Sequence, residues 1–133
     1  MGQKPARKQG LDNMQTVIAI VDDLFFASKI RGTAEQVGVR VQFVKSISTA
    51  IEKARDESPA LIIADLNANC CDPVELARAL KQDDSLSSVP LLGFFSHVQT
   101  ELQQAANAAG YDRVMPRSAF TRDLTQILSA DYT

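Results

Sequence analysis

Three aspartates directly follow two apolar segments of the sequence, and their carboxylates are the groups best suited to chemistry. Asp22 and Asp23 come after the apolar run 17–21, and Asp65 comes after the run 60–64. Both runs are short and aliphatic, without polar alternation, which is typical of β-strands buried on both faces. A carboxylate at a strand end can act as a nucleophile or bind a hard cation such as Mg²⁺.

These two strands belong to a longer alternation of apolar and amphipathic segments. Residues 39–44 alternate in polarity and indicate a strand nearer the sheet edge, while residues 89–95 and 113–115 indicate two further strands. Helices are predicted between the strands and after the last one, from apolar residues at helical spacing.

Local signals mark where several helices begin and end. Gly38 and Gly110 are placed to stop helices, and Asp72 followed by Pro73 is a favourable helix start. Ser118 is predicted to cap one last helix. The apolar residues of that helix are Phe120, Leu124, Ile127 and Leu128. Five helices are therefore predicted.

Five strands that alternate with five helices predict an α/β fold of three layers, in which helices cover both faces of a parallel sheet. For a chain of 133 residues the leading topology is the flavodoxin-like one, with strand order 2-1-3-4-5. We assign residues 15–133 to this single domain and residues 1–14 to a flexible basic tail.

Composition restricts the cellular setting and the partners. A net charge of −2 gives no basic face for direct nucleic-acid binding, and no apolar run approaches the roughly 20 residues of a membrane span. The two cysteines, Cys70 and Cys71, are adjacent and form no disulfide framework. We therefore expect a cytoplasmic protein without membrane or direct nucleic-acid contacts.

Strand order decides whether the three aspartates meet. In the order 2-1-3-4-5 the direction of winding reverses between the first and third strands, and ligands of such sheets bind near this point. Asp22, Asp23 and Asp65 are therefore expected to lie side by side, where their repulsion raises at least one pKa and favours a divalent cation. Taken singly, each aspartate is better explained as a turn residue or a helix cap.

At these residues the sequence resembles the CheY-like receiver domains of response regulators. Residues 17–23 (VIAIVDD) are similar to the family's first strand and acidic pair, and residues 61–67 (LIIADLN) to the strand with its phosphoacceptor aspartate. The spacing of the two segments also matches, and the resemblance extends over about residues 16–130.

The resemblance implies a role for each acidic residue. Asp65 would accept a phosphoryl group from a histidine kinase, a phosphotransfer protein or a small donor. Asp22, Asp23, Asp65 and Asn67 would hold Mg²⁺, with Asn67 contributing its backbone carbonyl. These roles agree with elementary chemistry, because a carboxylate nucleophile that faces an anionic donor needs a cation.

Two positions depart from the family pattern. Receivers carry a lysine at the end of the fifth strand, where this sequence has Met115, and methionine supplies neither a charge nor a donor. Arg117 is the candidate to contact a phosphoryl group in its place, although it is also explained as an exposed loop residue. Receivers end the fourth strand with Thr or Ser, where this sequence has Phe95. Ser96, one residue later, is either the missing hydroxyl or a cap of the next helix.

Two functions fit these residues. The first is a stand-alone receiver of a phosphorelay, which accepts phosphate on Asp65 and signals through an output protein bound at about residues 98–128. The alternative is a pseudo-receiver, a protein-interaction module of the same fold that is not phosphorylated, which Phe95 and Met115 favour. An enzyme is not expected, because phosphatases with acidic sites use Asp-x-Asp and nucleotide-binding folds need a Gly-rich loop, and neither pattern follows the first strand.

Overall fold

The computed structural model describes residues 15–129, in which five parallel strands form one sheet. The strands are β1 (Thr16–Ile20), β2 (Arg40–Val44), β3 (Leu61–Asp65), β4 (Leu91–Phe95) and β5 (Arg113–Pro116). Their order is β2-β1-β3-β4-β5, which confirms the predicted topology. β1 and β3 are buried along their whole length, whereas β2 lies at the edge and is mostly half-exposed. The predicted tail, residues 1–14, lies outside the described residues.

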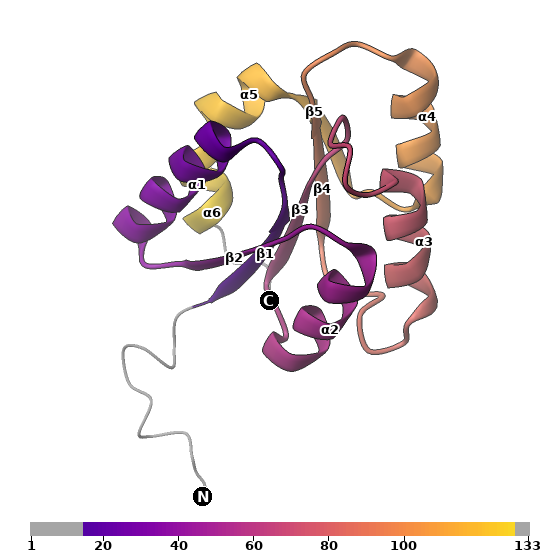
Figure 1. The fold of residues 1–133 in the computed structure, drawn as a ribbon, viewed down its shortest axis with the longest axis horizontal. Coiled ribbons are helices and arrows are strands. Elements are labelled where there is room, and N and C mark those ends of the chain that lie inside the picture. The colour runs from indigo at the N-terminus through magenta and orange to yellow at the C-terminus, as the bar shows by residue number, and fades with distance from the viewer. Residues whose placement is uncertain (1–14, 130–133) are drawn as a thin grey trace, which may run out of the picture.

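Helices cover both faces of the sheet (Figure 1), which confirms the three-layer α/β prediction. On one face lie α1 (Leu24–Val37), α5 (Arg117–Arg122) and α6 (Leu124–Ser129), and on the other lie α2 (Ile47–Glu57), α3 (Pro73–Gln82) and α4 (Thr100–Ala109). Side chains of the central strands alternate between the two cores. Val17 and Ala19 face α1 and α6, whereas Ile18 and Ile20 face α2 and α3.

Helix ends that carry strong local signals form as predicted. The Asp72 carboxylate accepts hydrogen bonds from the backbone amides of Val74 and Glu75 at the start of α3. Gly38 ends α1 with a φ of 76°, a left-handed conformation that glycine adopts without strain.

The single helix predicted at the end of the chain is wrong. Two short helices, α5 and α6, occupy this region, and Asp123 interrupts them. Ser118 does not cap a helix, because α5 already begins at Arg117, directly after the extended backbone of Pro116. The early start places Arg117 at the carboxyl edge of the sheet, where β5 ends.

Ser96 does not cap the next helix, which was one of the two roles predicted for it. α4 begins at Thr100, with Gln99 in the capping position. The backbone amides of Ser96 and His97 instead donate to the side chain of Asn67, which holds this stretch outside the helix.

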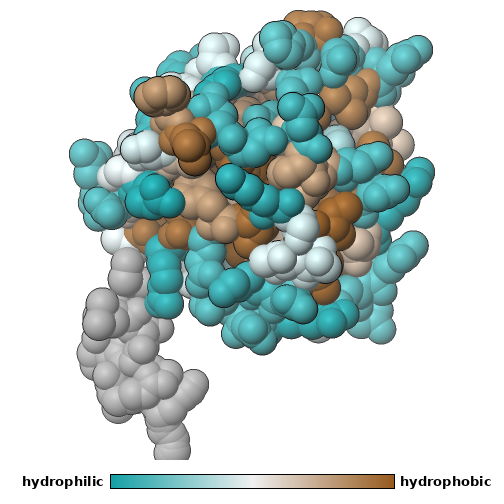
Figure 2. Space-filling model, viewed as in Figure 1, coloured by the Kyte–Doolittle hydropathy of each residue, from teal (hydrophilic) through white to brown (hydrophobic). Residues whose placement is uncertain are grey.

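The surface is mostly polar. On the face shown in Figure 2, hydrophobic residues are interspersed among hydrophilic ones. The strongly exposed large hydrophobic residues of the described part of the chain are Leu24, Phe25 and Val98. Among residues 15–129, none of the helices has both the length and the apolar character that a membrane crossing requires.

An aromatic cluster joins the elements that border the acidic residues. Phe26 of α1 lies with its ring centroid 5.1 Å from that of Phe94 in β4, and Phe94 stacks on Phe120 of α5 at 4.6 Å. Phe94 and Phe120 are fully buried. Ring pairs at these separations stabilise a fold beyond the area that they bury, so the starts of α1 and α5 are fixed to the end of β4.

Replacing Phe120 by alanine is expected to weaken this attachment. The free energy of unfolding should fall by about 3–5 kcal/mol, the usual cost of deleting a buried phenyl ring. Phe25→Ala is the matched control, because Phe25 is 91% exposed and its loss should change stability by less than about 0.5 kcal/mol. Urea unfolding followed by circular dichroism measures both variants, and equal effects would contradict the packing described.

Candidate functional site

The candidate site lies at the carboxyl ends of the central strands. β1 and β3 are hydrogen-bonded neighbours in parallel register, with Ile20 opposite Ala64. Asp65 ends β3, and Asp22 and Asp23 occupy the short link between β1 and α1. The three aspartates therefore belong to the same edge of the sheet, as the strand order requires.

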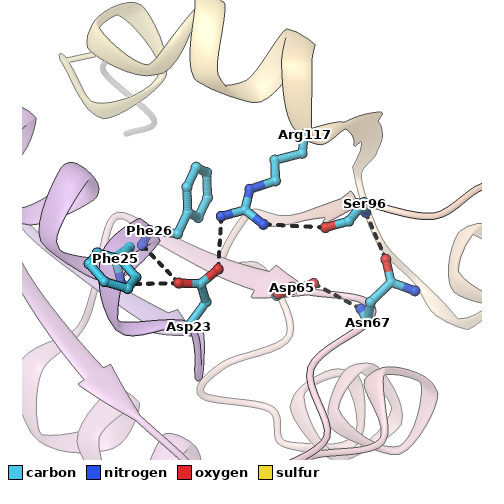
Figure 3. A network of polar contacts seen from close by, with 7 residues as sticks. All are labelled: Asp23, Phe25, Phe26, Asp65, Asn67, Ser96 and Arg117. Carbon is cyan, nitrogen blue, oxygen red and sulfur yellow. Dashed lines mark hydrogen bonds and ion pairs between the residues drawn. The ribbon is translucent and has the colours of Figure 1, made fainter.

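Asp23 uses both of its carboxylate oxygens within the protein (Figure 3). Its Oδ1 accepts hydrogen bonds from the amides of Phe25 at 3.0 Å and Phe26 at 3.1 Å, which caps α1. Its Oδ2 accepts a hydrogen bond from the Arg117 guanidinium at 3.1 Å, within an ion pair. The Phe26 amide and then Arg117 hold the pKa of Asp23 below its ordinary value, so this group is ionised at neutral pH.

Asp65 lies in a different environment. The residue is 7% exposed, and burial raises its pKa above the ordinary value. The Asn67 amide donates to its Oδ1 at 2.9 Å and lowers the pKa, as does the charge of Arg117, while Asp22 and Asp23 raise it further. Burial is the largest of these effects, so the ionised form of Asp65 is disfavoured in the fold.

The side chain of Arg117, which is half-buried, points toward Asp23 and Ser96 (Figure 3). Its guanidinium carbon lies 3.8 Å from the ring centroid of Phe26, a cation–π contact. One terminal nitrogen reaches Asp23, and the other lies 3.5 Å from the hydroxyl oxygen of Ser96. The two candidates for phosphoryl contact, Arg117 and Ser96, are thus brought together at the site, and the reading of Arg117 as an exposed loop residue is not supported.

The side chain of Asn67 makes contacts that the sequence around it did not indicate. Its side-chain oxygen accepts hydrogen bonds from the amides of Ser96 at 2.7 Å and His97 at 3.3 Å, and its side-chain nitrogen donates to Gln99 at 3.1 Å. Because the Asn67 amide also binds Asp65, this one residue joins the end of β3 to the start of α4. The sequence suggested only a backbone carbonyl as a metal ligand, and no signal near Asn67 indicates partners some thirty positions away.

The four predicted metal ligands do not fit a Mg²⁺ ion as they lie. Both oxygens of Asp23 are engaged, and one oxygen of Asp22 accepts the amide of Asn69 at 3.0 Å. Within residues 15–129, no group of three or more His, Cys, Asp or Glu side chains is arranged to hold a metal ion. A cation bound by Asp22, Asp23, Asp65 and Asn67 would therefore share Asp23 with the guanidinium of Arg117.

The sheet register shows which side chains lie at the two strand ends where receivers carry a lysine and a hydroxyl. Asp65 lies opposite Phe94, and Phe94 lies opposite Met115, so all three side chains share one face of the sheet. Met115 is 9% exposed and packs in the core under α1, α5 and α6. Phe95 packs against the opposite core, so the end of β4 carries no hydroxyl, and Ser96 contacts Arg117 from just beyond the strand.

Comparisons of the whole chain identify its fold. No family model and no curated protein match the sequence, whereas many solved structures do. A response regulator from Hahella chejuensis superposes with a TM-score of 0.76 at 19% identity, over 86% of this chain and 92% of that one. Chemotaxis response regulator CheY4 of Vibrio cholerae superposes with a TM-score of 0.75 at 21% identity, over 87% of this chain and 97% of that one. This chain has the receiver fold.

A further neighbour, response regulator Rcp1, was solved with Mn²⁺ bound. It superposes with a TM-score of 0.69 at 14% identity, over 86% of this chain and 89% of that one. The resemblance to CheY-like receivers inferred from the aspartates is thereby confirmed at the level of the fold. At these identities the roles of individual residues in this chain remain predictions.

The buried carboxylate of Asp65 leads to a prediction on stability. Its raised pKa means that the folded protein holds this proton more tightly than the unfolded chain, so ionisation at neutral pH costs stability. Asp65→Asn keeps the shape and an acceptor for the Asn67 amide but removes the charge. We expect the variant to be more stable than the wild type at pH 7, with a difference that shrinks as the pH falls toward the ordinary value of 3.8.

Thermal unfolding at several pH values measures this difference. Asp56→Asn is the control, because Asp56 is exposed near the end of α2, before β3 begins, whereas Asp65 lies at the far end of that strand. A wild type that is more stable than Asp65→Asn at pH 7 would show that local hydrogen bonds outweigh the burial of the carboxylate.

Proposed function

We propose that this protein is a signalling receiver domain of a phosphorelay, in which Asp65 accepts a phosphoryl group. The observation that carries the proposal is the guanidinium of Arg117 between Asp23 and Ser96, because it supplies positive charge next to Asp65 where Met115 cannot. The receiver fold and the place of Asp65 at the end of β3 support the same assignment.

The transfer consists of one displacement at phosphorus. A carboxylate oxygen of Asp65 attacks the phosphoryl group of a phosphohistidine, a phosphorus–oxygen bond forms, and the phosphorus–nitrogen bond breaks as the imidazole leaves. Arginine binds phosphoryl oxygens through charge-assisted hydrogen bonds, so Arg117 can offset the negative charge that the donor brings. The burial of Asp65 predicts slow transfer, because a phosphoryl donor has little access to a carboxylate that is 7% exposed.

Metal binding enters this proposal only in part. The Mn²⁺-bound neighbour Rcp1 is consistent with divalent metal at the acidic site of this fold. When bound, Mg²⁺ would neutralise charge and orient phosphoryl oxygens, and Asp22, Asp23, Asp65 and the carbonyl of Asn67 would hold it. Since these residues do not fit the ion as they lie, no step of the transfer is assigned to it.

The partners follow from the same assignment. A histidine kinase or phosphotransfer protein would deliver the phosphoryl group, and an output protein would bind at about residues 98–128, in the cytoplasm. The bonds from Asn67 to Ser96, His97 and Gln99 support this choice of surface, because they connect the turn after Asp65 to the start of α4.

A second candidate is a pseudo-receiver, an interaction module that is never phosphorylated. The specific observation in its favour is that Asp23 is already neutralised within the protein, while Asp65 is nearly inaccessible. Receivers carry a lysine at the end of the fifth strand and a hydroxyl at the end of the fourth. In this chain Met115 and Phe95 occupy these two positions, so neither group is present on β5 or β4 there.

Intact-protein mass spectrometry separates the two candidates. After incubation with Mg²⁺ and a small phosphodonor such as acetyl phosphate or phosphoramidate, we expect a slowly formed adduct of one phosphoryl group. Asp65→Asn should abolish the adduct, whereas Asp56→Asn, the exposed control, should keep it. No adduct under any donor or metal condition would support the pseudo-receiver.

Met115→Lys tests whether the missing ammonium limits the transfer. A lysine at position 115 shares the face of Asp65 and lies one strand beyond Phe94, so its amine can reach the site. We expect phosphorylation at least tenfold faster than in the wild type, together with some loss of stability from the buried site. Met115→Leu keeps the apolar core and should leave the rate unchanged; an equal gain in both variants would exclude a role for the charge.

A further inference from the structure

We infer that Arg117 is the resident counter-ion of the acidic site and competes directly with a divalent cation for Asp23. In this arrangement the guanidinium occupies the carboxylate that a metal ion needs, so the wild-type site binds metal weakly until Arg117 leaves. The inference deepens the proposed function, on which its biological meaning rests, but metal binding is measured without any phosphodonor.

The contacts of Asp23 are the first support. Its Oδ1 caps α1 and cannot turn away without exposing the amides of Phe25 and Phe26. Only Oδ2 is left to face an external ion, and Arg117 holds it at 3.1 Å. A dication at Oδ2 would lie beside this guanidinium, so repulsion between the two positive charges opposes metal binding while Arg117 stays in place.

The anchoring of Arg117 is the second support. The guanidinium lies 3.8 Å from the ring centroid of Phe26, which the aromatic cluster fixes, and it also contacts Ser96. Its side chain is 32% exposed, compared with 73% for Arg122, which pairs with the neighbouring Asp123. The guanidinium of Arg117 is thus more shielded from solvent than that of Arg122, and its contacts with Phe26 and Ser96 hold it beside Asp23.

The balance of charge is the third support. Three carboxylates and one guanidinium leave the site with two uncompensated negative charges, and removal of Arg117 leaves three. The same removal frees Oδ2 of Asp23. Both changes act in the same direction, so a hard dication should bind more tightly when Arg117 is neutralised.

Titration with Mn²⁺ alone tests the competition. The readouts are isothermal calorimetry and paramagnetic broadening of the amide resonances of Asp65, Asn67 and Asn69 in nitrogen-15-labelled protein. We expect Arg117→Gln, which removes the charge but keeps a polar side chain, to lower the dissociation constant at least tenfold. Arg122→Gln is the matched control and should bind Mn²⁺ like the wild type, because Arg122 pairs with Asp123 and not with the site.

Two further variants keep the test decisive. Arg117→Lys retains the positive charge and should bind Mn²⁺ less tightly than Arg117→Gln. Adding Asp23→Asn to Arg117→Gln should remove the gain, because the freed carboxylate is its source. The inference is overturned if the wild type already binds Mn²⁺ as tightly as a folded Arg117→Gln protein, or if Arg117→Lys binds as tightly as Arg117→Gln. Either of these results would contradict the competition at Asp23 but would not change the outcome of the phosphodonor test of Asp65. Absence of an adduct would contradict the proposed function but would not change the result of the Mn²⁺ titration.

Discussion

Negative charge gathered at one edge of the sheet is the constraint on which the rest of the site depends. The order β2-β1-β3-β4-β5 makes β1 and β3 neighbours, and the three aspartates follow their ends. Carboxylates this close destabilise a fold unless each has a partner. Two amides and a guanidinium bind Asp23, and one backbone amide binds each of Asp22 and Asp65. Because these donors come from the start of α1, from the loop after β3 and from α5, neutralising the charge also holds these three segments together.

Hydrophobic packing positions the guanidinium of Arg117. Phe26 follows Asp23 closely in the chain, and its ring supports the guanidinium that pairs with Asp23. The same ring contacts Phe94 and Phe120, which belong to β4 and α5. The ion pair and the aromatic cluster therefore connect the same elements, and each restricts the movement of the other. A long arginine side chain loses much conformational freedom when it is fixed, and this double support offsets that loss.

The sequence predicted those features that depend on local patterns. Buried strands, the edge strand and the cap at Asp72 follow from composition and spacing over a few residues, and strand order follows from general rules on parallel sheets. The split between α5 and α6 was missed, because Pro116 allows the helix to start at once and Asp123 then interrupts a continuous apolar pattern. The sequence left two alternatives open for Arg117, contact with the site or exposure in a loop, because the choice depends on the ring of Phe26 at the other end of the chain.

Met115 at the end of β5 carries no charge, so positive charge reaches the site from another element. A lysine at position 115 would approach along the row that contains Phe94 and Asp65, whereas Met115 extends the apolar core. The positive charge comes instead from Arg117, the first residue of α5, whose guanidinium donates a hydrogen bond to Asp23 rather than to Asp65. Under the proposed function, a phosphoryl group on Asp65 would attract this guanidinium away from Asp23. Since Arg117 begins α5 and Phe120 lies one turn later, such a shift would act directly on α5 and on the aromatic cluster beneath it.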